Sequence, residues 1–219
     1  MDETEDAKEI ILREISIENA EVRADYMKAF GDDARVFSDH MARAVVKWTR
    51  LDHGVKGREK AFVVALTHAA ISLQIQSMAC FLSGHVVAAG NLFRQVLEAI
   101  ALALLCSGKD GTVLPRFMDG KYSSSNAVRD VMRQGTRLRL KADGLSALKK
   151  SEEFYHLYSH ITHLTLGNLM SFAGDNVYVG SAFDEGKIKA YRKEIAGRIG
   201  LARVFPNFIE AVTANMATW

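Results

Sequence analysis

Several residue types are scarce in this 219-residue chain. It contains two prolines and two cysteines. Because proline is the commonest interruption of a helix, its scarcity favours long helices joined by short connections. Cys80 and Cys106 both lie in apolar runs, which predicts small core residues in a reducing compartment.

Motifs of several common enzyme classes are absent. The chain has no glycine-rich phosphate loop, no Gly-x-Ser-x-Gly nucleophile motif and no paired-cysteine zinc site. Its first residues, MDETEDAKE, are acidic, which is the reverse of a signal or transit peptide. We therefore expect a cytoplasmic protein without a cofactor, and these absences leave its enzymatic status open.

Two apolar segments are long enough to raise the question of a membrane. They cover 61–82 and 86–106. His68 and two glutamines interrupt the first segment, and Arg94 and Glu98 interrupt the second. A charged side chain near the centre of a bilayer costs about 3 kcal/mol on insertion scales. Both segments are therefore expected to be core helices, and no membrane association is predicted.

Apolar residues recur at helical spacing through most of the chain, which is 48% hydrophobic and 25% charged. The pattern predicts one all-α domain over 1–219, an up-and-down bundle of long antiparallel helices. Front helices are expected within 4–107 and back helices within 125–216, divided by a loop at 108–124. The individual helices are expected at 4–30, 33–52, 57–83, 85–107, 124–137, 145–170 and 184–216, with a second loop at 172–182.

Charge is distributed unevenly, although the net charge is only +2. Acids dominate the first thirty residues, and bases dominate 116–150. Arg129, Arg133 and Arg137 in the basic stretch could contact phosphates along one helix face. Such asymmetry is typical of a polyanion-binding face, of two faces that meet in a dimer, or of two solvated faces. We expect a homodimer, because many helices are richly apolar and the terminal segments carry unlike charges.

The most apolar helix-length segment, 85–108, carries a charged pair. Arg94 and Glu98 are four residues apart among valine, alanine, leucine, phenylalanine and isoleucine. With Asn91 they fall within about 60° on a helical wheel, so they form one polar stripe. Desolvating an ion costs several kcal/mol unless it is paired and hydrogen-bonded. The pair therefore requires partners from elsewhere in the bundle.

A second polar stripe consists of Tyr155, Ser159 and His163, spaced i, i+4, i+8. Two buried helices with one polar stripe each bury those stripes most economically against each other. We expect Arg94 to donate to the oxygen of Tyr155 or Ser159. Glu98 is expected to accept from His163. Two interpretations stay open: a buried network that fixes helix register, and a cleft in which Arg94 binds an anion and His163 acts as a general acid/base or ligand.

A metal site is a weaker hypothesis. His156, His160 and His163 share one helix face at i, i+4, i+7, but the first and last lie about 10 Å apart along the axis. One helix cannot easily place all three around one ion. Glu153-x-x-His156 matches half of a di-iron bundle signature, and the sequence contains no second copy. We predict no metal, with His156 and His160 as the weak candidates.

The motif Phe93-Arg94-Gln95-Val96-Leu97-Glu98, followed by Tyr155-x-x-x-Ser159-x-x-x-His163, resembles a group of uncharacterised prokaryotic proteins. These are HEPN-like all-helical proteins, and the likeness covers roughly 61–170. The resemblance implies an up-and-down bundle, often a dimer, sometimes associated with defence or toxin–antitoxin systems. It also implies one site lined by Arg94, Glu98, Tyr155, Ser159 and His163.

The ribonuclease motif of HEPN proteins, Arg-x4–6-His, is missing from this part of the chain. Its literal match, Arg35 to His40, lies in an earlier helix, and a pattern this short is expected by chance. The leading expectation is a module that binds a nucleotide or RNA through a polar seam between two core helices. The alternatives are a metal-independent ribonuclease using His163 or His40, and a purely structural network in an interaction protein.

Overall fold

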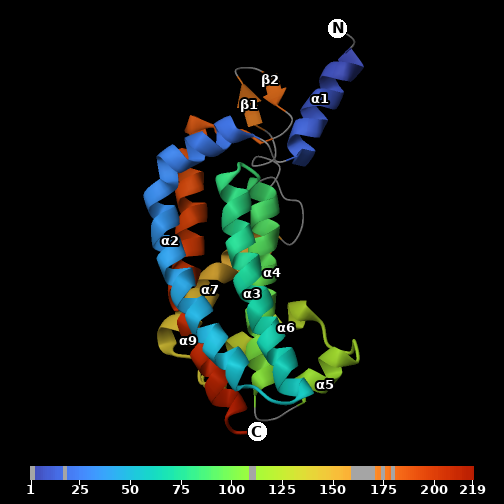
Figure 1. Ribbon diagram of the computed structural model, residues 1–219, viewed down its shortest axis with the longest axis vertical. Coiled ribbons are helices and arrows are strands. Elements are labelled where there is room, and N and C mark those ends of the chain that lie inside the picture. Colours follow the sequence, from blue (N-terminus) through green and yellow to red (C-terminus); the bar gives the residue numbers. More distant parts are fainter. Residues whose placement is uncertain (1–2, 17–18, 109–111, 159–170, 174–175, 179–180) are drawn as a thin grey trace.

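The computed structural model describes residues 3–16, 19–108, 112–158, 171–173, 176–178 and 181–219. The chain is all-helical with packed helices, as predicted, apart from one short hairpin (Figure 1). Its strands pair antiparallel, with Phe172 opposite Val177. The elements are α1 (Glu3–Ser16), α2 (Ala20–Gly54), α3 (Arg58–Leu82), α4 (Val86–Ser107), α5 (Val113–Met118), α6 (Ser124–Gln134), α7 (Ala142–Leu157), β1 (Ser171–Ala173), β2 (Asn176–Tyr178), the 3-10 turn η1 (Glu185–Lys187) and α9 (Ile188–Met216).

Two helix pairs form the body of the molecule (Figure 1). Helices α3 and α4 are antiparallel neighbours, whereas α2 and α9 run side by side in the same direction. Asn19 meets Ser181 at one end of that second pair, and Lys47 meets Glu210 at the other. Helix α6 packs on α4, and α7 packs on both α4 and α9. The expectation of antiparallel helices throughout is therefore wrong for α2 and α9.

The turn between α3 and α4 is fixed by Gly84. Its φ of +82° lies in the left-handed region, which glycine adopts without the strain that a side chain causes. A Cβ there would also lie 2.8 Å from a Val22 methyl and 3.0 Å from Ser181 Cβ. The predicted break after 57–83 is confirmed, and the predicted helices on both sides agree with α3 and α4 within two residues.

Other predicted boundaries differ from the structure. The helix expected at 4–30 is divided: α1 ends at Ser16, and α2 begins after Asn19, whose side chain accepts from the backbone N–H of Val22. Gly31 does not end a helix, because α2 continues past it with only a local distortion at Phe30 (φ −136°, ψ 16°). Buried aromatic residues before and after that distortion hold both parts of α2 in the core.

The predicted loop 108–124 contains the short helix α5, and the helix expected at 124–137 ends at Gln134. Helix α7 begins at Ala142, earlier than predicted, and is described as far as Leu157. Helix α9 continues through Pro206, which lies inside it.

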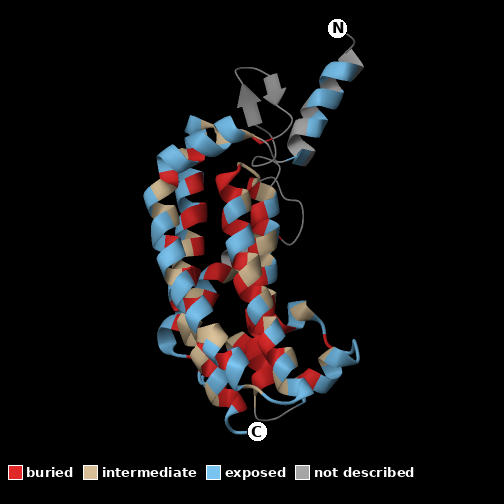
Figure 2. Cartoon of the chain, viewed as in Figure 1, coloured by how far each residue is buried: buried red, intermediate tan, exposed pale blue. Residues whose placement is uncertain are grey.

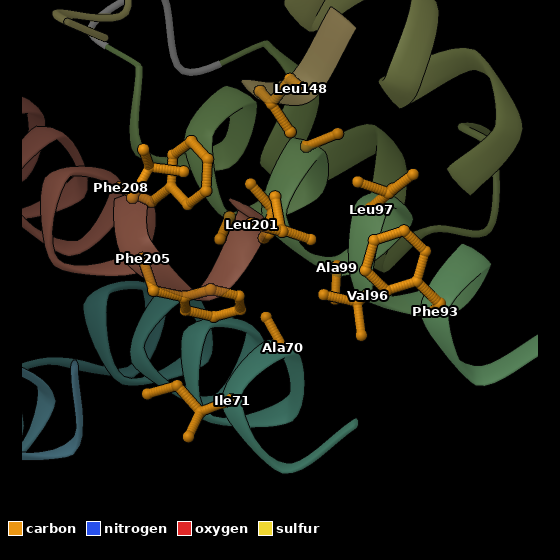
Figure 3. Close-up of a cluster of buried hydrophobic side chains, with 14 of the residues drawn as sticks. Ala70, Ile71, Phe93, Val96, Leu97, Ala99, Leu148, Leu201, Phe205 and Phe208 are labelled. Carbon is orange, nitrogen blue, oxygen red and sulfur yellow. The ribbon is translucent and has the colours of Figure 1, made fainter. Parts of the chain in front are cut away.

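The buried apolar residues form one cluster that reaches from α2 to the end of α9. Figure 3 shows its centre, where Phe205 and Leu201 of α9 lie among residues of three other helices. Ile71 comes from α3, Leu97 from α4 and Leu148 from α7. Burial removes the thiol of Cys106 from water and raises its pKa to about 12, and Cys80 is half-buried.

By length and composition, α3 and α4 are apolar enough to cross a membrane. Buried residues make up 44% of the most apolar window of α3 and 61% of that of α4. Figure 2 shows exposed positions recurring along α3, whereas the lower half of α4 is enclosed.

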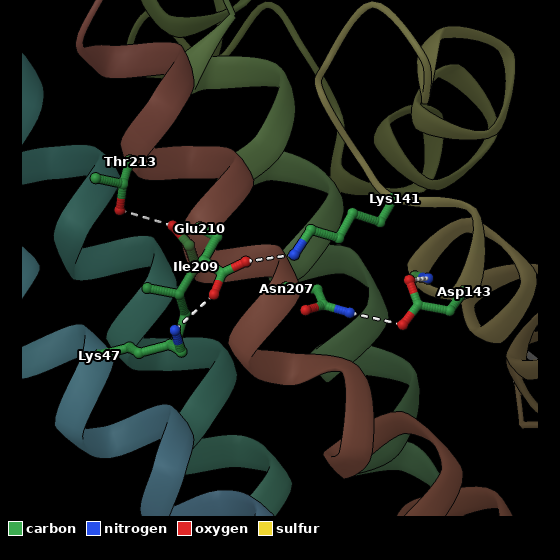
Figure 4. A network of polar contacts seen from close by, with 8 residues as sticks. Lys47, Lys141, Asp143, Asn207, Ile209, Glu210 and Thr213 are labelled. Atoms are coloured by element: carbon green, nitrogen blue, oxygen red, sulfur yellow. Dashed lines mark hydrogen bonds and ion pairs between the residues drawn. The ribbon is translucent and has the colours of Figure 1, made fainter.

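Polar contacts hold the start of α7 against α9 (Figure 4). Glu210 accepts from Lys141 just before α7 and from Lys47 of α2, and Asn207 donates to Asp143 at 2.7 Å. The hydrogen bond from Lys141, followed by that from Lys47, lowers the pKa of Glu210. These ion pairs stabilise the fold at pH values above the ordinary pKa of the carboxyl group. Their contribution is lost as the pH falls through the lowered pKa of Glu210.

Gly200 provides a test of the packing around α9. A Cβ at this position would meet nothing within 4 Å. Because glycine inside a helix costs about 0.5–1 kcal/mol relative to alanine, Gly200→Ala is expected to raise the free energy of unfolding by that amount. Urea unfolding followed by circular dichroism measures the change. A loss of stability would show that the space beside Gly200 is filled.

Candidate functional site

The charged pair predicted within α4 is an ion pair. Arg94 Nη1 lies 3.2 Å from Glu98 Oε1, one helical turn away. The Arg94 side chain is 30% exposed and that of Glu98 is 13% exposed. The pair therefore lies at the edge of the core and remains in contact with solvent through Arg94.

Tyr155 of α7 joins this pair, so the predicted contact between the two polar stripes is present at this residue. Its hydroxyl donates to Glu98 Oε1 at 3.3 Å, and the guanidinium carbon of Arg94 lies 5.7 Å from the centre of its ring. Arg94 therefore contacts Tyr155 as predicted, in part through a cation–π contact, and the alternative partner Ser159 lies outside the described residues. Burial, with the nearby carboxylate of Glu98, raises the pKa of Tyr155 and keeps the donor protonated.

Ser124, the first residue of α6, completes the cluster and was not predicted. Its hydroxyl donates to Glu98 Oε2 at 2.6 Å. Both carboxylate oxygens of Glu98 are thus engaged, and the carboxylate ties together α4, α6 and α7. We call these four residues, Arg94, Glu98, Ser124 and Tyr155, the Arg94 cluster.

The guanidinium of Arg94 uses only part of its donor capacity. Its Nη1 group pairs with Glu98. Within the described part of the chain, Nε is buried and has no hydrogen-bond partner. The N–H groups of Nε and Nη2 lie side by side on one edge of the guanidinium plane. Such an edge suits the two oxygens of a phosphate or carboxylate.

The remaining residues predicted for this site belong to the second polar stripe and to the histidines beside it. Ser159, His160 and His163 lie outside the described residues, so the role of His163 as an acid/base stays a prediction. His156 is described: its side chain is exposed, and Nε2 lies 3.7 Å from Glu152 Oε1. The described ranges contain no group of three or more His, Cys, Asp or Glu side chains that could hold a metal ion.

The basic residues predicted to contact phosphates are all exposed. Arg129 and Arg133 lie on α6, and Arg129 donates to the side chain of Asn126 at 2.7 Å. Helix α6 ends at Gln134, so Arg137 belongs to the turn that follows. The prediction that the three arginines share one helix face is therefore wrong for Arg137.

The Arg35–His40 pattern lies on α2, away from the Arg94 cluster in the chain. Arg35 is highly exposed and pairs with Asp32. Burial lowers the pKa of His40, and the charges of Arg43 and Arg203 lower it further. His40 is thus a neutral imidazole near pH 7.

A second ion pair, in the middle of α9, is far more deeply buried and was not singled out from the sequence. Arg198 is 1% exposed, and its Nη1 lies 2.8 Å from Glu194 Oε2. Its Nε donates to Ser77 Oγ of α3 at 3.0 Å. Tyr158 also donates to Glu194, at 2.8 Å.

Aromatic rings enclose the Arg198 guanidinium. Its carbon lies 5.1 Å from the ring centre of Phe81 and 5.4 Å from that of Phe93. The available signal was the i, i+4 spacing of Glu194 and Arg198 beside Ile195 and Ile199. The many charged residues at the start of α9 obscured it. This pair is sealed from solvent and serves the fold, whereas 30% of the Arg94 side chain is exposed.

No protein family model, no curated protein and no solved structure matches this chain. The all-helical fold and the Arg94 cluster are therefore the observations from which a function has to be argued. The likeness to HEPN-like proteins rests on short motifs and stays a prediction.

Proposed function

We propose that this protein is a helical binding module that holds a phosphate group of a nucleotide or of RNA at Arg94. The observation that carries the proposal is the Arg94 Nε–H group, which is buried and has no hydrogen-bond partner among the described residues. Glu98 and Tyr155 fix the guanidinium from the opposite side and over its face, so its orientation is set before a ligand arrives. Preorganised donors bind an anion without the cost of ordering a flexible side chain.

Glu98 is compatible with an anion beside it. Its two oxygens accept from Ser124 and Tyr155 and pair with Arg94, so its charge is shared among three donors. The exposed Arg129 and Arg133 of neighbouring α6 add positive charge to the same part of the molecule. This non-specific electrostatic attraction raises the affinity for a polyanion and makes that affinity depend on the salt concentration.

The HEPN-like up-and-down bundle, the cytoplasmic location and a role in defence or toxin–antitoxin systems are proposals that follow from the sequence resemblance. The alternative activity is a metal-independent ribonuclease with His163 as the acid/base. Incubation of the purified protein with total RNA separates the two. Cleavage that His163→Ala abolishes would support the enzyme, and intact RNA would support binding alone.

Arg94→Gln is expected to weaken binding of a fluorescein-labelled single-stranded RNA, and of AMP in competition with it, by about 10-fold or more. A hydrogen bond to a charged group contributes about 1.5–3 kcal/mol, which corresponds to such a change in Kd. Fluorescence anisotropy measures the affinity. Glutamine retains most of the volume of the side chain, so a correctly folded variant is expected.

Arg116→Gln is the matched control. Arg116 also lies over a tyrosine ring, at 5.4 Å from the centre of Tyr122, but it belongs to α5. Its removal is expected to change the affinity by less than about twofold. An Arg94→Gln variant that unfolds, combined with a wild-type protein that binds neither RNA nor AMP, would contradict the proposal and assign the cluster to the fold.

We also propose that the protein is a homodimer that uses the outer face of α3. No Asp, Glu, Lys or Arg occurs between positions 61 and 82, yet this helix is exposed along one side. A two-fold axis brings equivalent surfaces of two copies together, so a charged face would meet its own charge. The α3 face is neutral and mostly small or apolar. It consists of Ala61, Ala65, His68, Ile75, Gln76 and Ala79.

Ile75→Glu is expected to convert the dimer into a monomer, because it places like charges in the proposed interface. Size-exclusion chromatography with light scattering measures the mass. Val36→Glu is the control, since Val36 of α2 is 46% exposed and Ile75 is 44% exposed. A wild-type protein that is monomeric at all concentrations, or that partitions into lipid vesicles through this face, would contradict the proposal.

A further inference from the structure

Helices α7 and α9 line a cavity of about 330 Å³ that is partly open to solvent. Most of its lining is small: Ser146 and Ala147 come from α7, and Ala196, Gly197 and Gly200 come from α9. Small residues at a helix contact usually allow two helices to close on each other, since protein interiors are tightly packed. Here they leave a space, and its volume lies within the range of small-molecule sites, about 300–1,000 Å³.

One serine in the lining has a hydroxyl group that makes no hydrogen bond within the described part of the chain. Ser151 is only 4% exposed and lines the cavity. Its side chain makes no hydrogen bond with any of the residues that the structure describes. The Oγ atom keeps some accessible surface, so it can donate a hydrogen bond to a molecule in the cavity. A ligand oxygen in the cavity would satisfy this hydroxyl.

The charged side chains that line the cavity carry a net positive charge. Lys150 lines it from α7 and Arg203 from α9, and neither forms an ion pair within the described part of the chain. Asp143 also lines it, but its carboxylate already accepts from Asn207 at 2.7 Å and from the N–H of Gly144 at 2.8 Å (Figure 4). An anion between Lys150 and Arg203 would therefore neutralise charges that have no internal partner.

We propose that the α7–α9 cavity binds the phosphate group of a small phosphate monoester. Ser151 Oγ donates a hydrogen bond to a phosphate oxygen, and Lys150 and Arg203 supply the opposing charge from the two helices. Gly200 leaves the floor of the cavity open, because a Cβ there meets nothing within 4 Å. A second hollow of about 460 Å³ shares Arg203 and Gly200 and provides room for the remainder of the molecule.

This site is independent of the Arg94 cluster, with which it shares no residue. Both sites are proposed to bind phosphate, so the experiment needs variants that affect one site at a time. Protein-observed ¹H–¹⁵N NMR titration of the full-length protein with AMP and with inorganic phosphate is the measurement, and adenosine is the comparison that lacks the phosphate. Wild-type protein is expected to bind AMP and phosphate in the millimolar range or tighter and not to bind adenosine. Because AMP also probes the Arg94 cluster, the titrations are made in the Arg94→Gln background.

In that background, Ser151→Ala is expected to weaken AMP binding by about tenfold, the effect of a lost hydrogen bond to a charged group. Gly200→Met fills the cavity and is expected to abolish binding. Lys149→Gln is the control, because Lys149 adjoins Lys150 but lies outside the lining. It is expected to bind AMP like the background protein.

Three results would overturn the proposal. The first is an Arg94→Gln protein that binds neither AMP nor inorganic phosphate at 10 millimolar, about the weakest affinity of interest. The second is equal weakening by Lys149→Gln and Ser151→Ala, which would indicate general attraction to a basic surface. The third is equal binding of adenosine and AMP, which would remove the phosphate from recognition. Loss of RNA binding in the Arg94→Gln protein, with AMP binding kept in the cavity, would support both sites separately.

Discussion

Arg198→Met is expected to lower the free energy of unfolding by about 3–5 kcal/mol. The substitution keeps much of the volume of the side chain, so the main effect is electrostatic. It leaves Glu194 buried at 6% exposure without its cationic partner. It also removes the donor to Ser77 Oγ and the guanidinium between the Phe81 and Phe93 rings. Urea unfolding at neutral pH measures the loss.

A double-mutant cycle identifies the cause. Glu194→Gln keeps an acceptor for the Tyr158 hydroxyl, and combining it with Arg198→Met removes the unpaired charge. The double variant is therefore expected to be more stable than Arg198→Met alone. Arg192→Met on the exposed side of α9 is the control and is expected to change stability by less than about 0.5 kcal/mol. An Arg198→Met variant as stable as that control would contradict the described burial.

Gly90→Ala is expected to destabilise the protein, in contrast to Gly200→Ala. A Cβ at Gly90 would occupy the position of the Tyr158 ring, which packs directly on the backbone of α4. Moving that ring also disturbs its hydrogen bond to Glu194, now 2.8 Å long. Overpacking of this kind costs about 1–3 kcal/mol, which exceeds the gain in helix propensity of up to about 1 kcal/mol.

Thermal or urea unfolding of the two alanine variants gives a direct comparison. Both replace a glycine inside a long helix, so helix propensity contributes equally to each. The difference between them then reports the packing alone. Equal stabilisation by both substitutions would show that Tyr158 does not lie against Gly90.

The parts of the fold that the sequence predicted well are those set by local patterns. Long uninterrupted apolar periodicity and the Ser83-Gly84 break defined α3 and α4 within two residues. The expected gap between the helices at 4–30 and 33–52 is absent, because burial of Phe30 and Phe37 on either side of Gly31 holds the chain helical. The parallel arrangement of α2 and α9 is a property of the whole chain path, which local periodicity does not contain.

In the candidate site, too, the residues that local patterns mark were predicted and the others were not. Arg94, Glu98 and Tyr155 could be found because charged or polar residues at i, i+4 stand out in apolar helices. Ser124 could not, since a serine at the start of a helix usually serves as a cap and its bond to Glu98 crosses between helices. The α7–α9 cavity also had no sequence signal. Small residues predict close helix packing or an open space equally well, and the separation of the helices decides between them.

The central claim is that the Nε–Nη2 edge of the Arg94 guanidinium receives a phosphate group. Arginine Nε–Hε NMR spectra, recorded while AMP or a short RNA is added, observe that edge directly, and Arg94→Lys assigns the resonance. We expect the Arg94 Hε signal to shift in proportion to the ligand bound. The Arg198 Hε signal, held by Ser77 in the sealed core, should stay in place. A ligand that binds without moving the Arg94 signal, or an Arg94 signal unchanged at saturating AMP and RNA, would contradict the claim.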